Sequence, residues 1–288
     1  MIEKIARSLS LAATTAASLL KIAVRSRRPS PAVRREAGSA IVILGNGPSL
    51  AQTIARHSEW LASLPLLAVN FAANTEEWKR LRPEFYVLVD PHFFDGIRTN
   101  ANVERLWRNL SEAAWDITLY VPVSRAPEAR RLTAGSRIRV KTLNLTPVEG
   151  AKLIAHAAFR LGLGMPRPRN VLIPSIMIAM REGFDTIYLA GADHSWTRTL
   201  SVDDHNRVCT VQPHFYKDND SERQRVETTY SDIHLHQMLE SLTIAFRSYF
   251  RIADYADSRG CRVVNITPGS FIDAFPRATP PEAPTNSL

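Results

Sequence analysis

The chain has 288 residues, and its 45% hydrophobic and 22% charged side chains exclude a mainly disordered or fibrous protein. Its length fits one large domain with short appendages. Two cysteines, Cys209 and Cys261, are too few for a disulfide framework, which favours a reducing compartment. Residues 1–36 hold eight basic and two acidic side chains, so they carry +6 of the net charge of +8. The body carries only the remaining +2, which argues against a nucleic-acid partner.

The N-terminal segment has the pattern of an amphipathic helix. Apolar residues recur every three or four positions over residues 2–23, and Pro29 and Pro31 end the pattern and begin an extended linker. The most apolar stretch, residues 9–20, is about 12 residues long, whereas a spanning helix needs roughly 20. We therefore expect residues 1–38 to form a basic helix and linker that bind an anionic membrane surface. A helix packed on a partner, a poorly ordered tail and a secretory signal peptide are the alternatives.

From Ala40 onward, short apolar runs alternate with helical patterns. The runs expected to be buried strands are residues 41–44, 66–69, 85–89, 117–121, 186–190 and 262–265. Helices are expected at residues 50–64, 148–161, 174–181 and 231–259. This alternation predicts an α/β fold with a single Rossmann-like, doubly wound and mainly parallel sheet over residues 39–276. Polar residues 196–229 are expected to form a lid, and residues 277–288 a disordered tail.

A glycine-containing turn, residues 45–49 (GNGPS), follows the first predicted strand and opens the first predicted helix. Ligands of open α/β sheets bind at the carboxyl ends of the strands. Glycines let the backbone approach a ligand, and the helix start presents N–H groups to a phosphate. The turn is neither a GxGxxG nor a GxxxxGKS/T motif, so it is not a standard dinucleotide or P-loop signature.

Further polar residues stand at the ends of the other predicted strands, and this position makes them candidates for ligand contacts. Ser175 follows Pro174 and is expected to place its hydroxyl and N–H at another helix start. The predicted nucleotide contacts are Gly45, Asn46, Gly47, Ser49, Asn70, Asp90, Ser175, Gly191 and Asp193.

Three histidines are candidates for a general base. His214 lies in the predicted lid, where Pro213 stiffens the chain and Tyr216 is a candidate contact to the substrate. His236 is second, and His194, at a predicted strand end, is third. His234 and His236 point to nearly opposite sides of a helix, so we expect no metal site there.

Several motifs together resemble one group of bacterial and archaeal proteins. These are GNGPSL, AVN and VDP at the first three strand ends, PSIMIAMREGFDTIYLAGADH, and the terminal NITPGSF. Over residues 40–275 the chain resembles the MptE-like family, which is 6-hydroxymethylpterin diphosphokinase-like, and the related bacterial sialyltransferases of glycosyltransferase family 42. The resemblance implies a single Rossmann-like nucleotide-binding domain with a lid.

The resemblance also implies roles for single residues. Asn46, Gly47 and Ser49 match the sialyltransferase loop that contacts the nucleotide, and Asn70 and Asp193 match strand-end residues. Asp90 stands where that family has Asn before Pro, and Ile176 replaces the glycine of a Ser-Gly pair whose serine matches Ser175. No residue aligns with the family's general-base histidine; His214 and His236 are nearest.

The resemblance implies a glycosyltransferase whose donor is a CMP-linked 2-keto acid sugar, such as sialic acid or Kdo. The acceptor would be a glycan or a lipid-linked glycan, in surface polysaccharide or lipopolysaccharide synthesis. A monophosphate leaving group needs less charge neutralisation than a diphosphate, so we expect no cofactor. We then expect a cytoplasmic protein, peripheral on the inner face of the bacterial cytoplasmic membrane through residues 1–36.

Two other functions stay open. One is a Mg²⁺-dependent diphosphokinase acting on a 6-hydroxymethylpterin-like alcohol, with Asp90 and Asp193 as possible Mg²⁺ ligands. The other is a non-catalytic nucleotide- or glycan-binding module on the membrane, for which the basic N-terminus would be the main functional feature.

Overall fold

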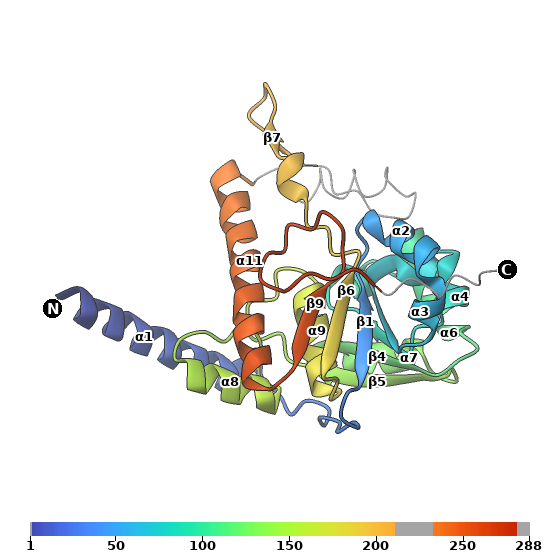
Figure 1. The fold of residues 1–288 in the computed structure, drawn as a ribbon, viewed down its shortest axis with the longest axis horizontal. Helices are drawn as coiled ribbons and strands as arrows, with labels where there is room; N and C mark the ends of the chain where they lie inside the picture. The colour runs from blue at the N-terminus through green and yellow to red at the C-terminus, as the bar shows by residue number, and fades with distance from the viewer. Residues whose placement is uncertain (1, 211–232, 281–288) are drawn as a thin grey trace.

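The computed structural model describes residues 2–210 and 233–280 (Figure 1). Its centre is a seven-stranded sheet in the order β5-β4-β3-β2-β1-β6-β9, with helices on both faces. Every pair of neighbouring strands in this sheet is parallel. The strands are β1 (Ala40–Leu44), β2 (Leu66–Val69), β3 (Phe85–Val87), β4 (Ile117–Pro122), β5 (Ile138–Leu143), β6 (Thr186–Ala190) and β9 (Arg262–Asn265). The predicted Rossmann-like α/β fold is confirmed.

The structure has more helices than the sequence predicted. The described helices of the body are α2 (Ser49–Arg56), α3 (Ser58–Ala62), α4 (Glu77–Leu81), α5 (His92–Asp95), α6 (Ala101–Ser111), α7 (Ala126–Leu132), α8 (Lys152–Leu161), α9 (Leu172–Arg181) and α11 (Leu235–Ser258). Of these, α4, α5, α6 and α7 were not expected. The helix expected over residues 50–64 is two helices, because the chain turns at His57. Short 3₁₀ turns cover Asn70–Asn74, Val123–Arg125 and Trp196–Arg198.

The strand sequences explain how both faces of the sheet are covered. Successive side chains of a strand point to opposite faces. In β1, Ile41 and Ile43 pack in the cluster that contains α9 and α11, whereas Val42 and Leu44 pack in the cluster that contains α2. All four are buried, so β1 reads as a continuous apolar run.

The order of the strands reverses direction at β1. The chain runs outward from β1 through β2, β3, β4 and β5, and then returns to place β6 on the other side of β1. After β1 the chain continues toward β2, and after β6 it continues in the opposite direction, toward β9. Such a switch point opens a crevice at the carboxyl ends of the strands. Residues 45–49 and 191–195 lie at this point.

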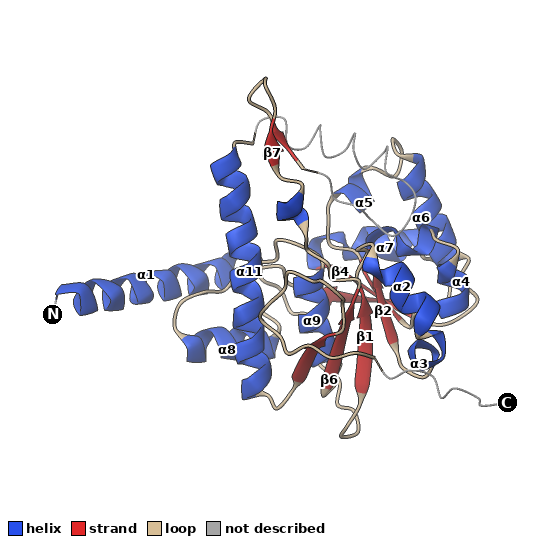
Figure 2. Cartoon of the chain, turned by 45° about the horizontal axis from the view of Figure 1, so that its top comes forward, coloured by secondary structure: helices blue, strands red, loops and turns tan. Residues whose placement is uncertain are grey.

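Helix α1 (Ile2–Arg25) precedes the body and extends beyond it (Figure 2). Among the described residues, no helix is long and apolar enough to cross a membrane. The linker that follows is extended, as predicted, and it is attached to the body: Val33 N–H donates to Arg181 O at 2.8 Å, and Gly38 N–H donates to Asp185 Oδ2 at 2.7 Å.

The predicted lid and tail fall only partly within the described residues. The start of the lid contains a small antiparallel hairpin, β7 (Ser201–Val202) with β8 (Val208–Cys209). At the other end, Arg277 forms a β-bridge with Asn265, so the chain is still attached to the sheet there. Residues 211–232 and 281–288 lie outside the described residues.

Candidate functional site

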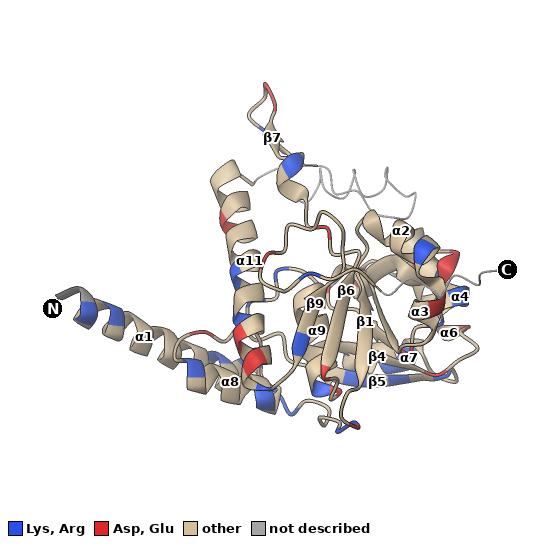
Figure 3. Cartoon of the chain, in the orientation of Figure 1, with Lys and Arg blue, Asp and Glu red and all other residues tan. Residues whose placement is uncertain are grey.

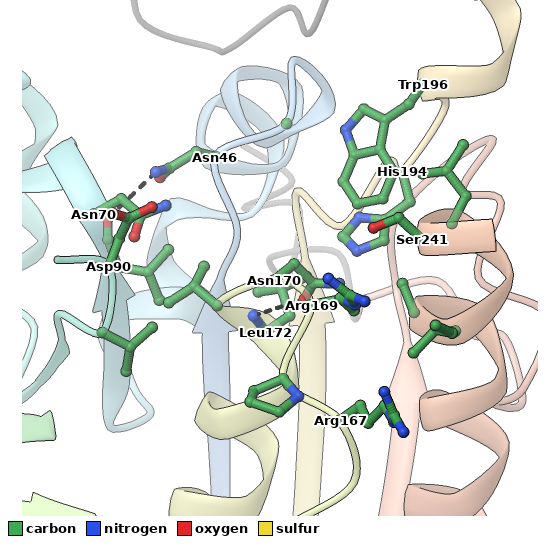
Figure 4. Close-up of a pocket in the computed structure, with 18 of the residues that line it drawn as sticks. Asn46, Asn70, Asp90, Arg167, Arg169, Asn170, Leu172, His194, Trp196 and Ser241 are labelled. Carbon is green, nitrogen blue, oxygen red and sulfur yellow. Dashed lines mark hydrogen bonds between the residues drawn. The ribbon is translucent and has the colours of Figure 1, made fainter. Parts of the chain in front are cut away.

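A cavity of about 830 Å³ lies at the carboxyl ends of the strands. Its walls come from the ends of β1, β2, β3 and β6, from the segment before α9, and from the first half of α11 (Figure 4). Of the predicted site residues, it is lined by Asn46, Gly47, Asn70, Asp90, Gly191, Asp193 and His194. The topological switch point thus brings together residues that are far apart in the sequence.

The loop after β1 is joined to the loop after β6. Gly45 N–H donates to Ala190 O at 2.7 Å, and Gly47 N–H donates to Gly191 O at 2.9 Å. Ser49 N–H donates to the Asp193 carboxylate at 3.3 Å. These three N–H groups therefore have acceptors within the protein and are not free for a phosphate, and nucleotide binding at this loop stays a prediction.

Asp193 holds these two loops together. Its Oδ2 accepts a 2.7 Å hydrogen bond from the Ser49 hydroxyl. Burial raises the pKa of Asp193, and the hydrogen bonds from Ser49 oppose that rise. A Cβ atom on Gly47 would overlap the same carboxylate and would lie 2.7 Å from Gly191 O. Gly47 is therefore required for the contact between the loops.

The ends of β2 and β3 form a second wall. Asn70 adopts a left-handed conformation (φ 52°), and its carbonyl accepts a 2.5 Å hydrogen bond from the Tyr86 hydroxyl. Asp90 is exposed and caps α5 by accepting a 2.9 Å hydrogen bond from His92 N–H. The His92 side chain lines the cavity, and its Nε2 atom is buried without a hydrogen-bond partner among the described residues.

His194 is held by a chain of hydrogen bonds. Its Nε2 lies 2.6 Å from the Tyr249 hydroxyl, which donates to Asn170 Oδ1 at 2.9 Å. Because the tyrosine proton is used on Asn170, Nε2 of His194 carries the proton of a neutral imidazole. Burial lowers the pKa of His194 to about 3, so the ring stays neutral and is a poor base. It also packs against Trp196 in a tilted arrangement, with 4.1 Å between the ring centroids.

Basic side chains enter the cavity from the segment before α9. Arg167 and Arg169 line it, and Figure 4 shows their guanidinium groups between the strand ends and α11. Asn170 caps α9 by accepting a 3.0 Å hydrogen bond from Leu172 N–H, and its buried Nδ2 has no partner among the described residues. Positive charge and a helix N-terminus make this end of the cavity suited to an anion.

Glu149 orients Arg167. Its carboxylate accepts a 2.8 Å hydrogen bond from Nε of Arg167 and a 2.6 Å hydrogen bond from Nη1 of Arg251. Burial alone would raise the pKa of Glu149, but the two arginines outweigh it and the pKa is lowered. Glu149 is therefore charged and keeps the Arg167 side chain in place.

Other predicted residues lie elsewhere. Ser175 is in the second turn of α9 and its hydroxyl donates to Val171 O at 2.7 Å, so the expectation that it starts the helix is wrong. Because α11 begins only at Leu235, His236 is exposed and is absent from the cavity wall. His214 and Tyr216 lie outside the described residues, so their roles stay predictions.

Several residues of the cavity wall were not predicted from the sequence: His92, Arg167, Arg169, Asn170 and Glu240. His92 had a signal, because it stands two positions after Asp90 at the end of a predicted strand. No sequence pattern pointed to Arg167 and Arg169. Their segment does not follow a strand, and the helix after it was predicted to begin at residue 174, later than it does.

In residues 2–210 and 233–280, no three His, Cys, Asp or Glu side chains form a group that could hold a metal ion. The two carboxylates considered as Mg²⁺ ligands already have protein partners. Asp193 is bound by Ser49, and Asp90 caps α5.

Among solved structures, the chain is similar to the MAf glycosyltransferase from Magnetospirillum magneticum AMB-1, with 14% sequence identity and a TM-score of 0.49. The match covers 92% of this chain and 37% of that chain, so this protein spans well under half the length of that structure. No family model matches the chain, and no curated protein matches it. Membership of the MptE-like family or of glycosyltransferase family 42 stays a prediction.

Proposed function

We propose that this protein is a glycosyltransferase that binds a nucleotide-activated sugar in the cavity at the β1/β6 switch point. The observation that carries the proposal is the cavity of about 830 Å³, which has the size of a small-molecule site. Aromatic rings of Phe71 and Trp196 and guanidinium groups of Arg167 and Arg169 both line it. Aromatic rings can stack on a base, and arginines can bind phosphate.

The proposed donor is a CMP-linked 2-keto acid sugar such as sialic acid or Kdo. Such a donor carries two anionic groups, the phosphate and the sugar carboxylate, and Arg167 and Arg169 supply two cations for them. The proposed acceptor is a glycan or lipid-linked glycan of a surface polysaccharide or lipopolysaccharide. The proposed phosphate site is therefore the segment before α9, and not the glycine-containing turn at residues 45–49.

We assign the base among the described residues to His92, because this residue lines the cavity and its buried Nε2 has no hydrogen-bond partner there. In the transfer, the base takes the proton of the acceptor hydroxyl while the acceptor oxygen bonds to the anomeric carbon. The bond from that carbon to the phosphate oxygen breaks, and CMP leaves with the electron pair. His92→Asn should keep donor affinity and lose about 10²–10⁴ in transfer rate, whereas a His214→Ala variant with that loss would return the role to His214.

The test of the nucleotide site is a thermal-shift screen over CMP, CDP, UDP, GDP and ATP, with and without Mg²⁺. We expect CMP to raise the midpoint without Mg²⁺, and Arg169→Ala to weaken the binding of CMP while leaving the binding of cytidine unchanged. Stabilisation by ATP with Mg²⁺ alone would favour the diphosphokinase. CMP binding without transfer to any glycan would favour the non-catalytic module, and no shift with any nucleotide would overturn the proposal.

A further inference from the structure

Helix α1 presents its apolar residues to solvent rather than to the protein. Its contacts with the body are made by Thr15, Ser18 and Ile22: Thr15 and Ser18 are buried, and Ile22 packs against the core. Leu9, Leu20 and Val24 are exposed, at 66%, 66% and 61%. A surface helix of a globular protein normally buries its apolar stripe. Here that stripe lacks a partner among the described residues.

Most of the large apolar residues exposed on α1 form one continuous stripe, whereas Leu11, exposed at 50%, lies on the side that contacts the body. At 100° per residue, Ile5, Leu9, Leu19, Leu20 and Val24 fall within an arc of about 140°. The residues that contact the body lie outside this arc. The stripe is therefore separate from the face that attaches α1 to the domain.

Helix α8 lies beside α1 and also exposes apolar residues. Ala151, just before α8, donates its N–H to the Thr15 hydroxyl at 2.8 Å, and the Ser26 hydroxyl donates to the carbonyl of Leu163, just after α8. The two helices therefore lie side by side, as Figures 1 and 2 show. Helix α8 exposes Leu153 at 84% and Leu161 at 59%. We call this surface the α1/α8 face; it consists of Ile5, Leu9, Leu19, Leu20, Val24, Leu153, Ile154 and Leu161.

Basic side chains lie on the side of α1 away from the stripe. Lys4, Arg7 and Arg25 are exposed there and Lys21 is half-buried, and Arg160 is exposed on α8. Figure 3 shows basic residues on both helices. A helix with apolar side chains on one side and basic ones on the other matches the interface of an anionic lipid bilayer. A second copy of this chain would instead bring two segments of charge +6 together, which like-charge repulsion opposes.

We infer that the α1/α8 face docks this protein on an anionic lipid membrane, with leucines of both helices inserted at the bilayer surface. Helix α8 belongs to the folded body. The membrane contact therefore fixes the orientation of the whole domain on the membrane, whereas α1 alone would only tether it. The inference does not depend on the proposed nucleotide site.

The test is flotation of the full chain with phosphatidylcholine vesicles that contain or lack phosphatidylglycerol. Leu9→Glu/Leu20→Glu on α1 and Leu153→Glu/Leu161→Glu on α8 should each lower partitioning at least about tenfold, because each leucine loses its transfer into lipid. The matched control is Val202→Glu/Leu239→Glu, which changes two apolar residues exposed at 46% and 45% elsewhere and should bind as the wild type does. Circular dichroism and the thermal midpoint confirm that each variant is folded.

A charge variant and a measurement of mass complete the test. Arg7→Gln/Lys21→Gln/Arg25→Gln should lose roughly a hundredfold on anionic vesicles and change little on neutral ones. Wild-type vesicle binding by the α8 leucine variant would show that α8 is not part of the membrane contact. Equal binding by the wild type and both leucine variants would overturn membrane docking by the α1/α8 face. A wild-type dimer in sedimentation that the leucine variants dissociate would assign the face to self-association instead.

Discussion

The guanidinium of Arg167 is hydrogen-bonded to the carboxylate of Glu149, with 2.8 Å between Nε and Oε2. Arg251 binds the other oxygen of the same carboxylate but does not line the cavity. The two arginines therefore share a structural role and differ in their access to a ligand.

This difference gives a matched pair of variants. Arg167→Ala and Arg251→Ala should each lower the free energy of unfolding by about 1 kcal/mol, because each removes a partly exposed, charged hydrogen bond. Only Arg167→Ala should also weaken nucleotide binding, measured by titration calorimetry. Equal affinity for the nucleotide in both variants would remove Arg167 from the site.

The buried, neutral His194 predicts a pH dependence of stability. Its pKa is about 3 in the folded protein and 6.5 for the unperturbed side chain, so between these values the unfolded chain binds a proton that the folded protein does not. The stability due to this group is complete above pH 6.5 and is lost as the pH falls toward 3, by at most about 1.4 kcal/mol per pH unit. Urea unfolding of the wild type and of His194→Gln should diverge over this range. Parallel curves would mean that His194 is accessible to protons.

Trp196 packs against His194 and lines the cavity, which makes it the candidate to stack on the base of the nucleotide. Trp196→Ala should weaken nucleotide binding by about 1–3 kcal/mol, the usual contribution of one stacked base. Thr197→Ala, an exposed neighbour outside the cavity wall, serves as the control. If both variants bind the nucleotide as the wild type does, the base lies elsewhere.

Gly47 should respond to substitution as a structural residue. A Cβ atom there overlaps the Asp193 carboxylate, so Gly47→Ala should separate the loops after β1 and β6 and cost about 1–3 kcal/mol of unfolding free energy. The measurement is urea unfolding without nucleotide. A Gly47→Ala protein with wild-type stability that no longer binds nucleotide would show that the turn contacts the ligand directly.

Much of the fold could be predicted because the central strands are buried on both faces. Ile41–Leu44 is a continuous apolar run, which is typical of such strands. Strand β5 could not be predicted in this way, because it lies at the edge of the sheet and alternates apolar residues with Arg139 and Lys141. The charged side chains interrupt the apolar run that identified the other strands.

The site was predictable where it depends on strand ends and not where it depends on packing. Strand ends brought Asn46, Asn70 and Asp193 to one cavity. The sequence does not show that Ser49 would bind Asp193, because this contact joins segments 144 residues apart. Pro174 suggested a helix start, but the Asn170 side chain caps α9 earlier in the chain. Because the helix start was placed too late, the arginines that precede it were not predicted to line the cavity.

A side chain large enough to fill the cavity would show whether the nucleotide binds there. Ser241 lines the cavity from α11 (Figure 4), whereas Thr243 is exposed on the same helix and outside the cavity wall. We would titrate CMP into Ser241→Trp and Thr243→Trp by calorimetry, with the thermal midpoint of each variant as the measure of folding. We expect the wild type and Thr243→Trp to bind CMP with equal affinity and Ser241→Trp not to bind it. Wild-type affinity for CMP in a folded Ser241→Trp protein would contradict the assignment of this cavity as the nucleotide site.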